Sequence, residues 1–330
     1  MTDPYSDLVY WGTRDSAWEG VRAETISVLG RPVRVLRHGP DPTAGRDSSI
    51  PQMFVHGLGG AARNWLDVLS PLSRFGETLA VDLPGFGDTP VPEGGSARVR
   101  ANAGFLPALL DALGWERVVL YGNSMGGLIA TLVASREPHR VERLVLVNPA
   151  LPPPRREMFK LGRPVLARIL PAALPGFGRL FVELGFRAKS AEELVDESLA
   201  SVLSETARLR EPYRRVLVEN VERAKAEGWR RSALCEAASS LVAMIAEATE
   251  LNEAVDGIEA PCLLLWGDAD KLVATHVIEG LMERRPDWEQ HIFRGVGHAP
   301  MIEAPDDFVD VVADWHERVA SGDHSTPAPA

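Results

Sequence analysis

Short apolar segments that each end at a turn recur along the chain, and they restrict its possible folds more than any other feature. Most of these segments carry no polar residue, and each is followed within a few positions by a glycine or a proline. A strand that is apolar on both faces belongs to a sheet covered by helices on both sides, as parallel sheets are. We therefore predict an α/β protein with a mostly parallel sheet. The candidate strands are residues 53–55, 79–81, 118–121, 144–147, 262–266 and 290–293.

Other elements are expected around these strands. Residues 25–28 and 33–36 flank Gly30-Arg31-Pro32 and predict a β-hairpin that precedes the parallel strands. Helices are expected over residues 64–73, from Met125 onward, and over residues 308–319.

The alternation of strands and helices stops at Pro149 and resumes at Cys262. Between them lie about 110 residues without a convincing strand, rich in proline and glycine at first and helical in periodicity later. Connections between elements usually take about 2–6 residues, so this segment is an insertion. We predict a core split into residues 1–149 and 260–320, a helical cap over 150–259, and a disordered tail over 321–330.

Charge and composition exclude several classes of protein. The chain has 330 residues with Lys+Arg 35 and Asp+Glu 46, a net charge of −11 that argues against a nucleic-acid partner. Cys235 and Cys262 are too few for a disulfide framework or a zinc site, and we expect buried thiols. No stretch approaches the roughly 18 apolar residues of a membrane span, and the first residues lack the pattern of a signal peptide. These features predict a cytoplasmic protein.

The pentapeptide Gly122-Asn123-Ser124-Met125-Gly126 is a G-x-S-x-G motif between a predicted strand and a predicted helix. A strand that turns abruptly into a helix holds the serine hydroxyl out at the end of the strand. Gly122 and Gly126 leave room for this turn, and the helix N-terminus favours negative charge. Although a glycine-rich turn can occur without catalysis, this context favours Ser124 as a nucleophile.

A nucleophilic serine needs a base and an acid that orients the base. His298 lies in a glycine-rich loop after the last predicted strand and is the best candidate base among the histidines. Asp268 and Asp270 both follow the preceding strand. We favour Asp270 because its longer distance from the strand lets the loop reach the histidine, while Asp268 caps the turn. Asn148 occupies the other position where an acid would be expected, which also favours Asp270.

The oxyanion of an acyl-transfer reaction needs two N–H donors. Met125, directly after the proposed nucleophile, supplies one. The turn that begins His56-Gly57-Leu58 follows an earlier strand and supplies the other, which we assign to Leu58.

Taken together, these motifs resemble the α/β-hydrolase superfamily, and specifically its cap-bearing serine hydrolases of the esterase and lipase type. The chain order Ser124, Asp270, His298 is the order of nucleophile, acid and base in that superfamily. The resemblance implies an eight-stranded, mostly parallel sheet with a helical cap inserted after the sixth strand. A serine at position 124 argues against the epoxide hydrolases and haloalkane dehalogenases, which use an aspartate. The motifs lie at residues 56–59, 82–88, 122–127, 267–270 and 295–300.

The resulting functional prediction is a hydrolase that cleaves a hydrophobic carboxylic ester through an acyl-enzyme, with no metal or organic cofactor. The elbow sequence also looks like that of the serine hydrolases that cleave carbon–carbon bonds in aromatic degradation. Those enzymes usually carry a longer glycine-rich turn and a tryptophan after the histidine, whereas Ala299 follows His298 here. A carbon–carbon hydrolase, an acyltransferase and a non-catalytic ligand receptor on the same fold remain alternatives.

Two further patterns in the sequence have more than one interpretation. Residues 57–62 fit the G-x-G-x-x-A pattern of dinucleotide-binding proteins, with Asp82 at the end of the next strand, but this pattern leaves the other motifs unexplained. Residues 155–189 carry eight basic against two acidic side chains, interleaved with apolar residues. That composition suits either a lid that contacts membrane lipid or an ordinary cap with a solvated basic face, and we favour the ordinary cap.

Overall fold

The computed structural model describes residues 11–39, 50–152, 173 and 178–322. Within them an eight-stranded sheet has the order β1-β2-β4-β3-β5-β6-β7-β8. The strands are β1 (Arg22–Val28), β2 (Arg31–His38), β3 (Gln52–Val55), β4 (Thr78–Val81), β5 (Val118–Asn123), β6 (Val141–Val147), β7 (Cys262–Gly267) and β8 (Glu289–Phe293).

The sheet is mostly parallel. β2 pairs antiparallel with β1 and with β4, while all pairs among β3 to β8 are parallel. Leu29 and Gly30 connect β1 to β2 with φ values of 51° and 76°, the left-handed conformation that favours a two-residue hairpin turn. The predicted hairpin and the predicted fold class are both confirmed.

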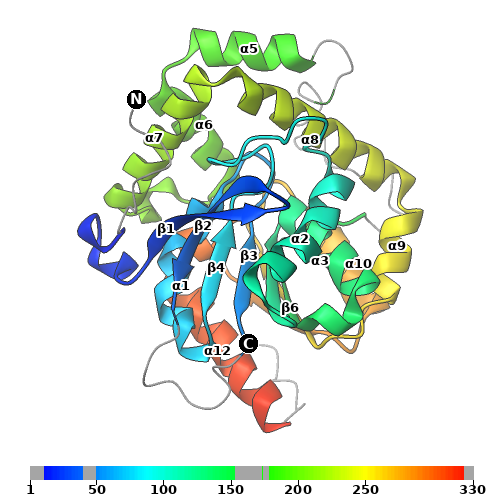
Figure 1. Cartoon of the computed structure of the whole chain (residues 1–330). Coiled ribbons are helices and arrows are strands. Elements are labelled where there is room, and N and C mark those ends of the chain that lie inside the picture. The colour runs from blue at the N-terminus through cyan, green and yellow to red at the C-terminus, as the bar shows by residue number, and fades with distance from the viewer. Residues whose placement is uncertain (1–10, 40–49, 153–172, 174–177, 323–330) are drawn as a thin grey trace.

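Alternate residues of each strand face two separate hydrophobic cores. On β3, for example, Met53 and Val55 belong to one core and Phe54 to the other. Helices α2, α3 and α10 cover the first face, and α1 and α12 cover the second (Figure 1). The described helices of these layers are α1 (Leu66–Leu72), α2 (Val99–Leu113), α3 (Met125–Arg136), α10 (Thr275–Arg284), α11 (Pro300–Glu303) and α12 (Pro305–Ser321).

The segment 150–259, called the insertion below, is helical where the structure describes it. Figure 1 shows α5 to α8 grouped together beyond one end of the strands. The last helix, α9, instead packs beside α3 and buries Leu251, Ala254 and Val255 in the first core. The insertion comprises α5 (Gly178–Ala188), α6 (Ala191–Val202), α7 (Glu211–Ala226), α8 (Gly228–Glu247), α9 (Thr249–Asp256) and the short 3-10 helix η8 (Thr206–Arg208).

The helices agree with the sequence prediction in part. The helices expected from Met125 and over 308–319 are present as α3 and α12, and the segment 64–73 forms η4 (Ala62–Trp65), α1 and a further 3-10 turn. Helix α2 was not predicted, because Gly104 and Pro107 weaken its local helical signal while its buried face packs against the sheet. Helix α12 ends at Ser321, and the rest of the predicted tail, residues 323–330, lies outside the described residues.

Candidate active site

Ser124 lies at the point where β5 ends and α3 begins. Its φ of 55° and ψ of −118° are a strained combination for a residue with a side chain. The backbone on both sides is held by the core. The Ser124 N–H donates to the Val147 carbonyl at 3.0 Å, and the Ser124 carbonyl accepts from the Ala150 N–H at 2.9 Å. The sequence motif therefore does form a sharp strand-to-helix turn.

Close packing explains why glycines lie two positions before and two positions after the serine in this motif. A Cβ atom at Gly126 would lie 2.3 Å from the Val55 carbonyl oxygen and 2.6 Å from that of His56. A Cβ at Gly122 would meet the Gly126 carbonyl oxygen at 2.4 Å. The end of β3 and the start of α3 are thus in backbone contact, which fixes the position of Ser124 relative to the turn after β3.

His298 and Asp270 form a buried pair. His298 Nδ1 lies 2.7 Å from Asp270 Oδ2, and the two side chains are 5% and 0% exposed. The other carboxylate oxygen of Asp270 accepts from the backbone N–H groups of Leu272 at 2.6 Å and Val273 at 3.1 Å. Because both oxygens are occupied, the carboxylate has one orientation, and that orientation fixes the imidazole ring.

Asp268, the competing candidate for the acid, and Asn148, which occupies the other position where an acid would be expected, have other partners. Asp268 accepts from the Gly295 N–H at 2.6 Å and lies 3.5 Å from Arg294, so it ties the loop after β8 to the end of β7. Asn148, at the end of β6, donates to the His298 carbonyl at 2.9 Å and accepts from the Gly267 N–H at 3.3 Å. Of the three side chains, the structure places only Asp270 on the imidazole.

The histidine loop is also held through its backbone. Asn123 on β5 donates to the His298 carbonyl at 3.1 Å, in addition to Asn148. The His298 N–H donates to the Val202 carbonyl at 2.6 Å, and Val202 is the last residue of α6 in the insertion. Both the sheet and the insertion therefore contact this residue directly.

The turn after β3 lies against the serine. A Cβ atom at Gly57 would lie 3.1 Å from Ser124 Cβ. His56 is buried, with Nδ1 2.8 Å from the Gly57 carbonyl and Nε2 accepting from the Leu83 N–H, and burial lowers the pKa of its ring. Leu58 lines the same pocket as Ser124, and Met125 is the first residue of α3, where backbone N–H groups have no acceptor within the helix. The two predicted oxyanion donors thus belong to a residue of this pocket and to the residue that directly follows Ser124.

Asp82, the aspartate of the dinucleotide-binding pattern, forms hydrogen bonds with the protein's own backbone. Asp82 is 1% exposed, and its two oxygens accept from the Ala62 N–H and the Asp88 N–H, each at 2.7 Å. A carboxylate buried in this way has no free oxygen for a ribose. Asp82 instead holds together the two turns that follow β3 and β4.

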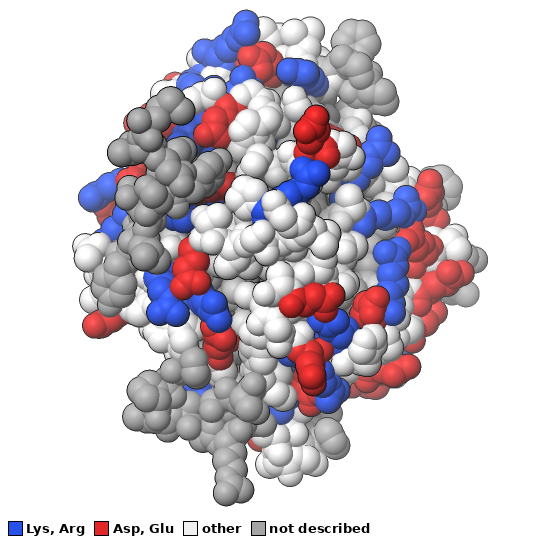
Figure 2. All heavy atoms as spheres, in the orientation of Figure 1, with Lys and Arg blue, Asp and Glu red and all other residues white. Residues whose placement is uncertain are grey.

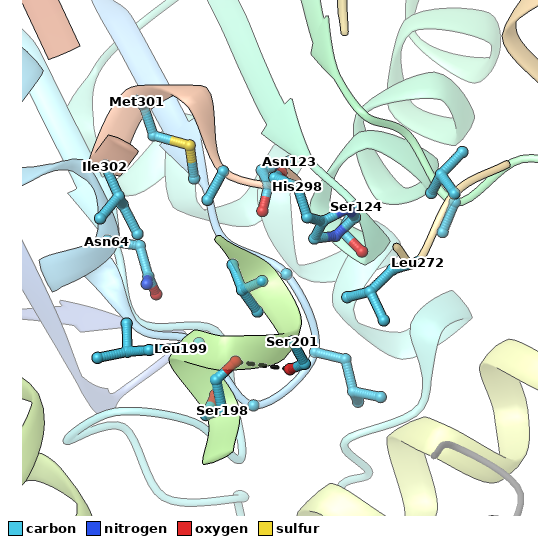
Figure 3. A pocket seen from close by; sticks show the side chains of 18 of the residues that line it. Asn64, Asn123, Ser124, Ser198, Leu199, Ser201, Leu272, His298, Met301 and Ile302 are labelled. Atoms are coloured by element: carbon cyan, nitrogen blue, oxygen red, sulfur yellow. Dashed lines mark hydrogen bonds between the residues drawn. The ribbon is translucent and has the colours of Figure 1, made fainter. Parts of the chain in front are cut away.

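Ser124 and His298 line a common pocket of about 360 Å³ between the sheet and the insertion. In Figure 3 they lie on one side of the pocket near Leu272, and Asn64, Leu199 and Ile302 lie on the other. Aliphatic side chains from α6, α7 and α8 complete the wall, among them Val195, Leu217, Val221, Leu241 and Ile245. The pocket suits a substrate with apolar groups around its reacting carbonyl.

Arg63 is the only lysine or arginine among the described pocket residues, and its charge is already paired. It forms an ion pair with Asp88, which also binds Arg230 on α8 at 2.9 Å. The NH1 group of Arg63 also donates to Asn220 on α7 at 3.1 Å. These contacts join the turn after β3 to two helices of the insertion, and the neighbouring cations lower the pKa of the Asp88 carboxyl.

Most of the basic stretch predicted at 155–189 lies outside the described residues. Of its three basic side chains that are described, Arg179 is exposed, Arg187 lies 3.1 Å from Glu183 and Lys189 lies 2.6 Å from Glu197. Figure 2 shows basic and acidic side chains interspersed on the face in view. These pairs are what an ordinary solvated cap surface would contain.

Three further observations concern cysteines, metals and membranes. Cys262 is buried as predicted, whereas Cys235 is partly exposed, and burial raises the pKa of both thiols. No group of three or more His, Cys, Asp and Glu residues in the described part of the chain is arranged to hold a metal ion. None of the described helices is long and apolar enough to cross a membrane.

Sequence reasoning missed several residues that hold the site. Asn123 lies inside a recognised motif and Lys271 directly follows one, but neither was given a role, and Glu303 was not considered. The signal for Glu303 was available, since it directly follows the apolar Met301 and Ile302 at the start of the last helical region. A charged residue in such a context is often buried with hydrogen-bond partners.

Comparisons with known proteins agree on the kind of protein. A family model described as "Alpha/beta hydrolase family" matches residues 53–311. A 2-hydroxy-6-oxononadienedioate/2-hydroxy-6-oxononatrienedioate hydrolase from Cupriavidus pinatubonensis is 30% identical over 283 residues, covering 84% of this chain and 89% of that protein.

Two other similar proteins have different names. A pimeloyl-[acyl-carrier protein] methyl ester esterase from Aeromonas hydrophila is 25% identical, covering 79% of this chain and 92% of that protein. The crystal structure of a bacterial membrane phospholipase A is similar with a TM-score of 0.68 and 28% identity, covering 93% of this chain and 89% of that one.

Proposed function

The chain belongs to the alpha/beta hydrolase family, and on this premise we propose that it hydrolyses a carboxylic ester with a hydrophobic group. The observation that carries the proposal is the placement of Ser124 in a strained turn, in the same pocket as the buried His298–Asp270 pair. These are the parts that nucleophilic acyl transfer needs.

The proposed reaction uses each of these residues in turn. His298 takes the proton from the Ser124 hydroxyl as its oxygen attacks the ester carbonyl, and Asp270 stabilises the resulting imidazolium. The Leu58 and Met125 N–H groups bind the oxyanion. His298 then protonates the leaving alcohol, and water attacks the acyl-enzyme to release the acid. The reaction as proposed needs no metal and no organic cofactor.

The insertion supplies the substrate specificity in this proposal. We assign residues 1–149 and 260–320 to the catalytic core and 150–259 to a cap, with α9 packed on the core. Aliphatic residues of α6, α7 and α8 face the proposed nucleophile across the pocket. A medium-sized apolar acyl or alcohol group would fill this space.

A carbon–carbon bond hydrolase is the second candidate, because the similar Cupriavidus protein carries such a name. A nonadienedioate has two carboxylates, which need cationic or polar partners in a pocket. Arg63 is the one lysine or arginine among the described pocket residues, so two carboxylates would have to share a single guanidinium that already forms an ion pair with Asp88. The ester proposal is favoured for this reason.

A chain-length series of p-nitrophenyl esters tests the proposal on the wild type and on Ser124→Ala. We expect the best turnover at medium chain length and a loss of at least about 10³-fold in kcat/KM in the variant. Undiminished turnover in Ser124→Ala would remove Ser124 from the mechanism. Cleavage of a 2-hydroxy-6-oxo-dienedioate without cleavage of any ester would select the second candidate, and binding without turnover of either would select a receptor.

A further inference from the structure

The end of helix α6 is bonded to the loops that carry Asp270 and His298. We call residues Ala200–Glu205 the strap. The His298 N–H donates to the Val202 carbonyl at 2.6 Å. Lys271, next to Asp270, donates through Nζ to the Ala200 and Leu203 carbonyls, each at 3.0 Å. The strap thus contacts both halves of the acid–base pair, although it belongs to the insertion.

Glu303 joins the strap to the histidine loop. Its carboxylate has no exposed surface. One oxygen accepts from the Gly297 N–H at 2.7 Å, directly before His298. The strap supplies the Ser204 N–H at 3.0 Å, the Glu205 N–H at 3.0 Å and the Ser204 hydroxyl as further donors. One side chain therefore fixes two backbone segments that are far apart in the sequence.

The energetics make this junction a strong one. A buried carboxylate without partners costs several kcal/mol, and donors that satisfy it form charge-assisted hydrogen bonds. If the strap moved away, Glu303 would lose the Ser204 and Glu205 donors and stay buried with the Gly297 N–H alone. Arg208, on η8, lies 3.8 Å from the Glu303 carboxylate and donates to the Gly295 carbonyl at 3.2 Å. This hydrogen bond adds a second link between the insertion and the loop that carries His298.

Close backbone packing leaves little freedom between the two segments. A Cβ atom at Gly297 would lie 2.5 Å from the Val202 carbonyl oxygen and 2.7 Å from the Ser204 nitrogen. The strap and the histidine loop therefore touch without intervening side chains. A shift of one segment displaces the other, and with it the His298 backbone.

We propose that Glu303 is a positioning residue for the acid–base pair. It clamps the strap to the Gly297–His298 backbone, so that the imidazole is aligned with Ser124 only when the end of α6 is in place. The inference rests on the proposed function, in which His298 is the base. It adds that the insertion holds the catalytic machinery in position as well as lining the pocket.

Glu236 offers a matched control, because it joins the insertion to the core in the same way at a distant place. This α8 residue accepts from the Ser96 hydroxyl at 2.7 Å and the Ala97 N–H at 3.0 Å. It does not line the pocket. Glu303→Gln and Glu236→Gln thus each remove a carboxylate that joins the insertion to the core, from side chains that are 0% and 34% exposed, and only the first junction contacts His298.

The test measures kcat, KM and melting temperature for both variants on the best ester of the wild type. We expect Glu303→Gln to lower kcat about 10–100-fold with KM within about twofold, because small misplacements of catalytic groups cost this much. Glu236→Gln should keep kcat within about twofold, with a smaller fall in melting temperature because its carboxylate is partly exposed. The same ranking is expected for the rate at which a fluorophosphonate labels Ser124, a readout that needs no substrate.

Ser204→Ala keeps the test decisive if Glu303→Gln does not fold. It removes one donor to Glu303 and should lower kcat severalfold. Proton NMR of the His298 Nδ1–H signal checks the positioning itself, and we expect the signal to broaden or shift in Glu303→Gln and not in Glu236→Gln. An unchanged kcat and an unchanged signal in the Glu303 and Ser204 variants would overturn the inference. Loss of the proposed function would be seen separately, as a Ser124→Ala variant that retains turnover.

Discussion

Ser124 and His298 lie in one pocket but are held in place by different parts of the chain. The backbone of Ser124 contacts β6, the residues just after β6, and its own helix, and the packing at Gly126 involves β3. The backbone of His298 contacts β5 and β6 through Asn123 and Asn148, and the insertion through Val202. The backbone of the proposed nucleophile is therefore held by the core and by Ala150, the first residue after it, whereas the proposed base is also held by a helix of the insertion, α6.

Because of this difference, changes in the insertion affect the two residues differently. A turn fixed by backbone packing between β3, β5 and α3 is insensitive to what is inserted after β6. A histidine loop bonded to the end of α6 is sensitive to it. Changes in the insertion can thus alter the alignment of the base as well as the shape of the pocket, without disturbing the nucleophile.

The largest effect on kcat is expected from a substitution of Asp270, the residue that holds His298. Asp270→Asn should lower kcat about 10³–10⁴-fold, because an amide at this position no longer stabilises the imidazolium or selects the required tautomer. Steady-state kinetics with a p-nitrophenyl ester measures the loss. Asp268→Asn is the control, since Asp268 contacts Gly295 and not the ring. Equal losses in both variants would mean that the pair acts through loop structure alone.

The next effect tests the Ser124 side. Gly126→Ala should destabilise the fold by about 3 kcal/mol, because overpacking in a rigid region costs about 1–3 kcal/mol or more. The new Cβ would meet the Val55 carbonyl oxygen, a backbone atom that cannot rotate away. Urea denaturation measures the change in the free energy of unfolding. A stable, fully active variant would show that the elbow is not held by this packing.

A smaller change in stability is expected from relief of strain at the elbow. Ser124→Gly should raise the free energy of unfolding by about 1 kcal/mol, because glycine tolerates a φ of 55° that costs other residues about 1–3 kcal/mol. Ser124→Ala, which lacks the hydroxyl but keeps the Cβ, is the control and should show no such gain. Equal stability of the two variants would argue that the turn is unstrained.

The smallest effect should come from a single link between the strap and the acid loop. Lys271→Ala removes two hydrogen bonds to the strap and should lower kcat about threefold, since net hydrogen-bond energies are about 0.5–1.5 kcal/mol. Lys225→Ala, which removes a lysine bonded to a carbonyl inside the insertion, should leave kcat unchanged. A fall in kcat for both would mean that any loosening of the insertion matters, wherever it occurs.

The sequence predicted the parts of the molecule that depend on local patterns. The strands, the hairpin and the sharp turn at Ser124 follow from short-range spacing of apolar residues and glycines, and all three are confirmed. The preference for Asp270 over Asp268 came from loop length, and the structure places Asp270 on His298. Whether this pair is catalytic stays a proposal until the variants are measured.

The parts that were missed depend on contacts between distant residues. Nothing in the residues around Glu303 or Ser204 indicates that they meet, since the contact is formed only when the insertion folds back on the sheet. Helix α9 was likewise assigned to the cap by its position in the chain, whereas its buried face packs against α3. Hydrophobic periodicity identifies which face of a helix or strand is buried, but it does not identify the element against which that face packs.

The bond between Glu303 and the strap also has a consequence for the order of folding. Its partners are separated by 99 residues, whereas the backbone hydrogen bonds of Ser124 reach no further along the chain than Val147 and Ala150. Closing a long loop costs conformational entropy before its contacts form, so distant junctions tend to form late. During refolding from denaturant, helical circular dichroism should therefore recover before esterase activity, since the base is aligned only after the chain on both sides of the insertion has come together.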